Sequence, residues 1–364
     1  MNTPIRYGII GSGMMGREHM QNIALIPDSE IVAIADPYPE SRALAGELAG
    51  PGIAVYEDYR ELLGAGGVDA LVVATPNHTH LDVLQDIIRD GSAAVLVEKP
   101  LCTTLEQARR LTEAAAGFAP VFWVGQEYRF MPPVARLIDE IRAGRTGRLR
   151  MLAIREHRFP FLAKVGDWNR FNRNTGGTLV EKCCHFFDLM RLILEDEPVR
   201  IYGSGDQDVN HLDERYDGET PDMLDNAFVT VDFRGGSRAL LDLCMFAEAS
   251  RFQEEIAATG DAGKVECFVP PAGALSATTV VVSERGAPEV TTIPVEVDEK
   301  VLAAGHHYGS TYFEHLAFQR AVRGDGAVLV TLEDGLKAVA MGLAAERSIA
   351  ERRPIDLGET YWLG

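Results

Sequence analysis

The chain has 364 residues, 46% of them hydrophobic and 24% charged, which fits about two well-buried globular domains. Its formal net charge of −19 argues against nucleic acid and anionic membranes as partners, because phosphate groups would be repelled. No apolar run reaches the roughly 18 residues of a membrane span, and the first residues lack the features of a signal peptide, so we expect a cytoplasmic protein.

Short apolar runs alternate with amphipathic stretches over residues 1–126. The runs YGIIGSG, EIVAIAD, DALVVAT, AAVLVEKP and VFWVG have the near-continuous apolar content of strands that are buried on both faces. The stretches between them have helical spacing. This alternation predicts an α/β domain with a parallel sheet covered by helices, of the kind that binds dinucleotides.

Residues 127–364 have a different pattern, which predicts a second, α+β domain. Segments such as RLRMLAIREHRF, NAFVTVDF and, at residues 277–284, ATTVVVSE are typical of antiparallel strands. A helix is expected among them over residues 179–194, with Thr178 as its N-cap. Two more helices close the chain, and we expect the last one, residues 333–351, to pack back towards the first domain.

Three glycines in GIIGSGMMG form a G-x-G-x-x-G pattern directly after the first strand and at the start of a helix. Gly11 makes the tight turn, Gly13 lets the backbone reach a pyrophosphate, and Gly16 permits close packing of the helix. Phosphates then bind at the helix N-terminus, where Met14 and Met15 lie. The alternative is a glycine-rich turn in a domain that binds no cofactor.

Asp36 ends the second strand, 20 residues after Gly16. A carboxylate at this place bonds the ribose 2′-hydroxyl of NAD and repels the 2′-phosphate of NADP. Pro37 and Tyr38 offer no cation to such a phosphate, whereas Arg42 keeps NADP open as the lesser alternative. We therefore expect NAD as the cofactor.

Polar side chains follow two later strands of the predicted parallel sheet. Thr75, Asn77 and His80 follow one strand, and Glu98 and Lys99 follow another. Ligands of open α/β sheets bind outside the carboxyl ends of the strands, so we expect these residues to line the cofactor site. The alternative for Asn77, together with His78, is capping of the next helix, and we expect that role for His78.

The stretch GGTLVEKCCHFFD places Glu181, His185 and Asp188 on one face of the expected helix. A metal site would need further ligand clusters elsewhere in the sequence, so we expect no metal. The adjacent Cys183 and Cys184 do not form a C-x-x-C redox pair, and we interpret them as packing residues. An acid/base pair and a plain surface pair of Glu181 with His185 remain as alternatives.

The glycine pattern, ATPNHTH, EKPL and TGGTLVEKCCHFFD, in this order and at these separations, resemble the Gfo/Idh/MocA oxidoreductase family of glucose–fructose oxidoreductase, inositol dehydrogenase and rhizopine catabolism proteins. The resemblance covers nearly the whole chain. It implies a Rossmann domain with a nicotinamide cofactor, and a second domain whose open, mostly antiparallel sheet is used in oligomerisation, so we expect a homodimer or homotetramer. It also implies that Lys99, the motif carboxylate and His185 form the catalytic set.

The motif departs from the family pattern at two neighbouring positions. The usual aspartate is Glu181, one methylene longer, and Lys182 follows it in place of a small apolar residue. We expect His185 to accept the proton of a substrate hydroxyl, Lys99 to stabilise the alkoxide, and Glu181 to support His185. Whether Glu181 takes over the aspartate's role unchanged stays open.

Residues 150–173 carry a local excess of positive charge, which favours an anionic substrate. The alternative places half of these cations on a solvated strand face or at a subunit interface. Aromatic side chains in the same stretch suit a sugar ring. The candidate substrate contacts are Tyr128, Lys164, Trp168, Asn169, Arg170, Lys182, His185, His307 and Tyr308.

The resemblance and these residues predict NAD-dependent oxidation of a ring hydroxyl of a sugar or inositol, with an anionic sugar favoured. The alternative, also implied by the resemblance, is an NAD-dependent glycosidase: oxidation at C3, elimination of the aglycone, addition of water and re-reduction of the ketone. A sulfoquinovoside would be such a substrate, with Glu181 or Tyr128 as the extra acid/base. A non-catalytic NAD sensor predicts loss of Lys99 and His185, which the chain retains.

Overall fold

A computed structural model describes residues 3–271 and 278–363, which form two compact units. Unit 1 comprises Met1–Glu127, Asp298–Leu336 and Leu363–Gly364, and unit 2 comprises Tyr128–Val297 and Lys337–Trp362. The sequence placed everything beyond residue 126 in the second domain, whereas residues 298–336 group with unit 1. The physical reason is that helix α11 (Ser310–Val322) packs on helix α1 (Met14–Ile23).

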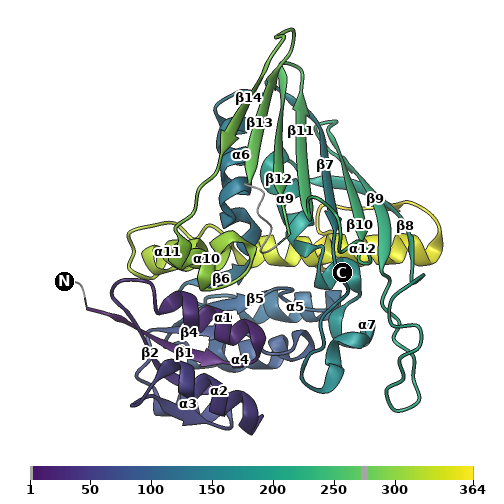
Figure 1. The fold of residues 1–364 in the computed structure, drawn as a ribbon. Coiled ribbons are helices and arrows are strands. Elements are labelled where there is room, and N and C mark those ends of the chain that lie inside the picture. Colours follow the sequence, from purple (N-terminus) through teal and green to yellow (C-terminus); the bar gives the residue numbers. More distant parts are fainter. Residues whose placement is uncertain (1–2, 272–277, 364) are drawn as a thin grey trace. The chain divides into compact units, whose positions relative to one another are not determined.

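Unit 1 contains a parallel six-stranded sheet in the order β3-β2-β1-β4-β5-β6 (Figure 1). The apolar runs predicted the parallel sheet and five of its strands, all except β3. Because β1 pairs with both β2 and β4, the strand order reverses there, and ligands of such sheets bind beyond the carboxyl ends of the strands at this point. The strands are β1 (Ile5–Ile10), β2 (Ser29–Ala35), β3 (Ala54–Tyr56), β4 (Ala70–Val73), β5 (Ala94–Glu98) and β6 (Phe122–Gly125). The remaining helices of this unit are α2 (Pro39–Ala49), α3 (Tyr59–Ala65), α4 (His80–Asp90), α5 (Leu105–Ala114) and α10 (Glu299–Ala303).

Unit 2 contains a nine-stranded sheet in the order β14-β13-β12-β11-β7-β10-β9-β8-β15. Among the described strands, β7 with β10 is the parallel pair and the other pairs are antiparallel. The expected strand at 277–284 is present from Thr279, and position 277 lies outside the described residues. The strands are β7 (Leu149–His157), β8 (Pro198–Asp206), β9 (Asn226–Phe233), β10 (Arg238–Cys244), β11 (Glu254–Gly260), β12 (Gly263–Val269), β13 (Thr279–Glu284), β14 (Val290–Pro294) and β15 (Ile355–Asp356).

The two faces of the unit 2 sheet have different surroundings. One face packs against α6 (Pro132–Arg142) and α9 (Cys184–Leu194), which lie along it in Figure 1. The alternate residues of the same strands point the other way, and Met151, Phe228 and Leu240 are exposed there. The last long helix, α12 (Leu332–Glu351), belongs to both units: its residues up to Leu336 are part of unit 1, and those from Lys337 are part of unit 2. Among the described helices, none has the length and apolar character to cross a membrane.

Candidate active site

The glycine-rich turn between β1 and α1 leaves space for a ligand at one of its three glycines. A Cβ atom at Gly11, whose φ is +88°, would lie 2.6 Å from a carbonyl oxygen after β4, and one at Gly16 would lie 2.0 Å from the Gly11 oxygen. A Cβ atom at Gly13 would meet nothing within 4 Å. The first and third glycines are therefore required by backbone packing, and the second borders open space at the N-terminus of α1, beside Met14 and Met15.

Asp36 is held in place by the backbone at the end of β2. Its carboxylate accepts the N–H of Ser12 at 2.7 Å and that of Tyr38 at 2.8 Å. Arg42 donates to the Asp36 carbonyl at 2.6 Å and lies 3.5 Å from the carboxylate of Glu57. These partners tie the guanidinium to acceptors of this chain, which weakens the case for a 2′-phosphate beside it.

His80 and Asn77 are buried after β4. The ring nitrogens of His80 lie 2.9 Å from the Pro100 oxygen and 3.0 Å from the Thr75 oxygen, so this ring joins the segments that follow β4 and β5. The hydroxyl of Thr79 donates to that of Thr75 at 2.8 Å. His80 therefore shapes the backbone at this edge, and its contact with a cofactor stays a prediction.

Glu98, at the end of β5, connects Lys99 to a buried pair of histidines. One carboxylate oxygen accepts the N–H of Lys99 at 3.1 Å, and the other lies 2.8 Å from Nε2 of His19, whose Nδ1 lies 2.8 Å from Nε2 of His315. Burial lowers the pKa of His19, but the hydrogen bond to Glu98 and the charges of Glu98, Glu18 and Glu127 together raise it above its usual value. Burial, followed by the His19 charge, holds the pKa of His315 well below its usual value.

The helix expected over residues 179–194 is interrupted, and the expectation of one continuous helix is wrong. Helix α8 ends at Glu181 and α9 begins at Cys184. Between them Lys182 has φ −100° and ψ −45°, and Cys183 has φ −86° and ψ −3°, which form a turn. The turn lets the Lys182 side chain reach Glu156 of β7, an ion pair that no local pattern in the helix could reveal.

The N-terminus of α8 (Thr178–Glu181) is bound by an acid from α12. Glu346 accepts the N–H of Leu179 at 2.9 Å. Gly177 has φ +97°, and a Cβ atom there would lie 2.3 Å from a carboxylate oxygen of Glu346. Burial, against the hydrogen bond from Leu179, raises the pKa of Glu346 to about 7.

The structure brings together three of the predicted substrate contacts, Tyr128, Lys182 and His185, all in unit 2. The Lys182 ammonium donates to the Tyr128 hydroxyl at 2.7 Å and lies 3.0 Å from Glu156. The Tyr128 ring stacks on the imidazole of His185 with centroids 4.3 Å apart and planes 8° apart. Glu181 and His185 are both buried, so the alternative of an exposed surface pair does not hold.

The contacts of Asp188 and of the two cysteines of the motif indicate a structural role. Asp188 forms a two-point ion pair with Arg129, at 2.6 and 2.5 Å, and is fully buried. Cys183 and Cys184 are fully buried free thiols, and burial raises the pKa of Cys183 well above its usual value. Both cysteines therefore act as packing residues, in agreement with the sequence.

The basic segment is largely neutralised by one acid of its own, Glu156, and by three acids from elsewhere in unit 2. Four of its arginines have carboxylate partners: Arg155 with Glu255, Arg158 with Glu156 at 3.5 Å, Arg170 with Glu214 at 3.0 Å and Arg173 with Glu219 at 2.5 Å. Asn169 and Arg170 are buried and donate to the Leu162 and Phe161 carbonyls of their own loop. Lys164 and Trp168 are half-buried in the same loop.

His307 and Tyr308, predicted from AGHHYGSTY as substrate contacts, lie in unit 1. Both have left-handed backbone conformations, with φ +53° and +56°. Nδ1 of His307 lies 3.1 Å from a carboxylate oxygen of Glu127, which follows β6. Such strained positions are often found at functional sites, but the contact with substrate stays a prediction.

Glu127, Glu18 and His307 form the group of described residues whose donor atoms are close enough to hold a metal ion, within 4.8 Å of one another. No sequence motif pointed to Glu18 or Glu127, and His307 was predicted only as a substrate contact. The hydroxyls of Ser310 and Thr311 donate to Glu127 at 2.7 and 2.9 Å. Burial, followed by the Glu127 charge, raises the pKa of Glu18. These contacts stabilise the acids without requiring an ion.

Two sequence models of one family together match most of the chain. The model described as "Oxidoreductase family, NAD-binding Rossmann fold" matches residues 5–126, and "Oxidoreductase family, C-terminal alpha/beta domain" matches residues 138–357. The chain belongs to the Gfo/Idh/MocA oxidoreductase family. The resemblance seen in the sequence is thereby confirmed, together with its fold class.

Three known proteins illustrate this similarity. The rhizopine catabolism protein MocA of Rhizobium meliloti is 35% identical over 205 residues, 55% of this chain and 60% of that protein. Inositol 2-dehydrogenase of R. meliloti (strain 1021) is 26% identical over 97% of this chain and 99% of its own. The solved structure of a levoglucosan dehydrogenase with NADH has a TM-score of 0.82 at 20% identity, covering 97% of this chain and 99% of that one, which shows a common fold.

Membership of the Gfo/Idh/MocA family makes unit 1 an NAD-binding Rossmann domain, and its described residues fit that cofactor. Gly13 borders open space at the N-terminus of α1, and Asp36 stands where a ribose hydroxyl binds in such domains. Gly11, Gly16 and the buried Asn77 also belong to the predicted cofactor set at this edge of the sheet. The expectation of NAD is confirmed.

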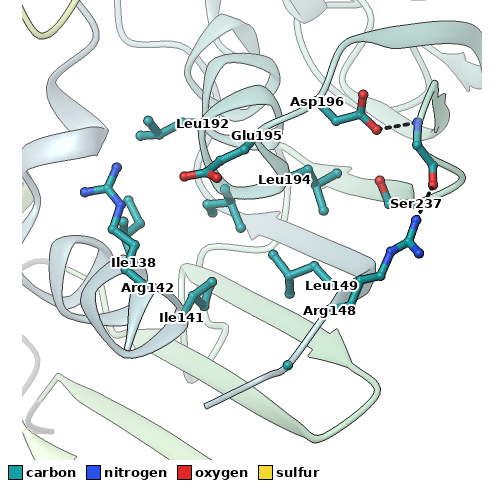
Figure 2. A pocket seen from close by; sticks show the side chains of 13 residues that line it. Ile138, Ile141, Arg142, Arg148, Leu149, Leu192, Leu194, Glu195, Asp196 and Ser237 are labelled. Carbon is teal, nitrogen blue, oxygen red and sulfur yellow. Dashed lines mark hydrogen bonds between the residues drawn. The ribbon is translucent and has the colours of Figure 1, made fainter. Parts of the chain in front are cut away.

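A hollow of about 610 Å³ in unit 2 shares no residue with the predicted site (Figure 2). It lies at the far end of α9 from His185, where Leu192, Glu195 and Asp196 meet Arg142 and Arg148. Asp196 there accepts a backbone N–H at 2.6 Å. We assign no step of the chemistry to it.

Sequence reasoning missed the acids and histidines that hold the candidate residues in place. They are His19 and His315 behind Glu98, and Glu156, Glu254 and Glu346 around the motif of unit 2. Each lies far along the chain from the residue it holds. The unusual Lys182 was the one local signal, since a lysine in an otherwise apolar run demands a buried partner.

Proposed function

We propose that the chain oxidises a ring hydroxyl of an inositol or a sugar with NAD. The observation that carries this proposal is His185, which belongs to the family motif, is buried, and is stacked on Tyr128. A fixed imidazole is suited to take the proton of a hydroxyl whose carbon gives up a hydride. The names of the inositol and levoglucosan dehydrogenases among the relatives support a polyol or sugar.

The chain's own residues have three roles in this proposal. His185 accepts the hydroxyl proton, Lys99 donates a hydrogen bond to the same oxygen and stabilises its negative charge, and Glu181 supports the imidazole. Bound NAD supplies the hydride acceptor. Gly13 and Asp36 bind the phosphates and the ribose.

We further propose that the substrate is uncharged, although the sequence favoured an anionic sugar. Four arginines of the basic segment have carboxylate partners, and these pairs cancel most of the positive field. Lys164 and Trp168 are the residues of this loop that we assign to the substrate, with Trp168 stacking on a sugar ring. A Lys164→Ala variant that loses activity only on charged sugars would contradict an uncharged substrate.

The deciding experiment offers inositols and hexoses with NAD and follows NADH by absorbance. We expect stoichiometric NADH, and loss of turnover in Lys99→Met and His185→Gln variants that still bind NAD. Cleavage of a nitrophenyl glycoside that requires NAD but accumulates no NADH would replace the dehydrogenase with the glycosidase. Unchanged turnover in both variants would refute the assigned roles.

The exposed face of the unit 2 sheet supports a homo-oligomer. Phe228 is 60% exposed, Met151 55% and Leu240 37%, an unusual display of large apolar side chains on strands. We propose that a second copy of the chain covers them. Light scattering should report a dimer or tetramer that Phe228→Asp dissociates, and a monomeric wild-type protein would exclude this assembly.

A further inference from the structure

Two buried carboxylates face each other across neighbouring strands behind the motif of unit 2. Glu156 of β7 and Glu254 of β11 are register partners, and they are 0% and 2% exposed. Like charges directly opposite each other in a sheet are destabilising, and burial increases the cost. These two acids therefore need a compensating cation and hydrogen-bond donors from whatever packs on this face of the sheet.

Lys182 supplies the cation. It is 3% exposed, and its ammonium lies 3.0 Å from the Glu156 carboxylate. Arg158 is the second cation near Glu156, at the longer distance of 3.5 Å. The ammonium also donates to the Tyr128 hydroxyl at 2.7 Å, so it links the acid to the tyrosine.

Tyr128 passes this connection on to His185. Its hydroxyl accepts from Lys182 and donates to Glu254 at 3.1 Å, which fixes the ring at its polar end. The ring then packs edge-on against Phe186 at 5.6 Å and face-on against His185 at 4.3 Å. Because a single hydroxyl proton satisfies both partners only in one orientation, the tyrosine forms a fixed platform for the imidazole.

We propose that Lys182 is a positioning residue for His185, acting through Tyr128 and the carboxylates of Glu156 and Glu254. This role rests on the proposed function, in which His185 takes the substrate proton. It explains why a lysine stands where the family has a small apolar residue. The tyrosine platform sets the plane of the imidazole, and an imidazole displaced by about 1 Å can cost on the order of 100-fold in rate.

The test compares Lys182→Met with Lys182→Arg and with Lys337→Met. Lys337 is the matched control, since it is 6% exposed and pairs with Glu197 at 2.9 Å, but has no part in this network. We expect Lys182→Met to lower kcat on the order of 10- to 100-fold with little change in KM for NAD. Lys182→Arg should retain much of the wild-type kcat, and Lys337→Met should leave kcat near wild type. A loss of kcat in Lys337→Met equal to that in Lys182→Met would overturn the proposal.

A double-mutant cycle tests the route through the tyrosine. If Lys182 acts through Tyr128, Lys182→Met should add little to the kcat loss of Tyr128→Leu, because the platform is already gone. Multiplicative losses would show that Lys182 acts independently, and would refute this route.

A spectroscopic measurement separates this inference from the proposed function. The imidazole carbon-bound proton of His185, assigned by comparison with His185→Gln, should carry an upfield ring-current shift from Tyr128 in histidine-labelled NMR spectra without substrate. We expect Lys182→Met to reduce that shift while the other histidine resonances stay unchanged. If the His185 resonance is the same in Lys182→Met as in wild type, the positioning role is refuted, even if the protein is a dehydrogenase. If the resonance differs between them but wild type oxidises no polyol, only the proposed activity is refuted. Should Lys182→Met fail to fold, Tyr128→Phe, which keeps the ring and removes the hydroxyl, must show the same displacement.

Discussion

Glu346 of α12 binds the backbone N–H of Leu179 at 2.9 Å, so an acid 167 residues further along the chain fixes the start of the motif that carries Glu181 and His185. The same carboxylate fills the space in which a side chain at residue 177 would lie. The double glycine of the motif is thus explained by its neighbour on α12 as well as by its backbone conformation.

The Glu346 carboxyl should make stability depend on pH. Its pKa is raised from 4.5 to about 7 in the folded chain, so between these values the folded state retains a proton that the unfolded state has lost. Stability therefore falls as pH rises through this window, by about 3 kcal/mol at most. Melting temperatures of wild type and Glu346→Gln across the window should converge at the acid end and separate at the alkaline end, with the variant more stable. Parallel curves would contradict this.

Gly177→Ala should destabilise the chain more than Gly286→Ala. Both glycines have positive φ, +97° and +84°, and each substitution incurs backbone strain of about 1–3 kcal/mol. Only at position 177 would the new Cβ meet an atom, the Glu346 oxygen at 2.3 Å, whereas position 286 has nothing within 4 Å. Thermal melting of the two variants measures the difference, and equal losses would show that Glu346 yields without cost.

The glycines of the cofactor turn should separate binding from folding. Gly13→Ala should fold normally but bind NAD on the order of tenfold more weakly or worse, because its methyl group occupies the space left for the pyrophosphate. Gly16→Ala should lower the melting temperature, since its Cβ would lie 2.0 Å from the Gly11 oxygen. Calorimetric titration with NAD and melting curves check both outcomes, with Gly46→Ala, which meets no atom within 4 Å, as the control.

His19→Leu should destabilise unit 1 by about 3–5 kcal/mol, because it leaves the buried Glu98 carboxylate without its charged partner. The raised pKa of His19 also predicts a pH dependence. The stabilisation is complete below the unfolded value of about 6.5 and is lost as pH rises through the folded value. Melting curves at increasing pH should show wild type approaching the variant, and a constant gap would refute a charged His19.

Five of the six strands of the unit 1 sheet could be predicted because they are long apolar runs and the turn after the first of them carries glycine. The three-residue β3 was not expected, since its residues are half-buried or exposed. Three described strands of unit 2 were not expected: β8 begins at Pro198 and contains Gly203 and Gly205, β14 lacks any alternation of buried and exposed residues, and β15 has only two residues. These features are not typical of β-strands, so the pairing of these segments with neighbouring strands could not be predicted from the sequence.

The residues of the candidate site also fall into those that the sequence could identify and those that it could not. The glycine turn, Asp36, Lys99 and His185 could be found from local motifs, since their chemistry needs fixed spacings. The partners could not: Glu346 reads as one more acid of an amphipathic helix, and Glu214 and Glu219 as solvent-exposed loop residues. Long-range electrostatic pairing leaves no periodic signal, so the sequence shows the basic charge of residues 150–173 but not the distant carboxylates that pair with it.

The ion pair between Lys182 and Glu156 also limits which substitutions these two positions can accept during evolution. Loss of Lys182 alone would leave the buried Glu156 with only the more distant Arg158 as a cation, and loss of Glu156 alone would remove the carboxylate partner of the buried Lys182. Homologues with a small apolar residue after the motif carboxylate should therefore carry an uncharged residue in place of Glu156. The two positions, 26 residues apart, should therefore covary among homologues.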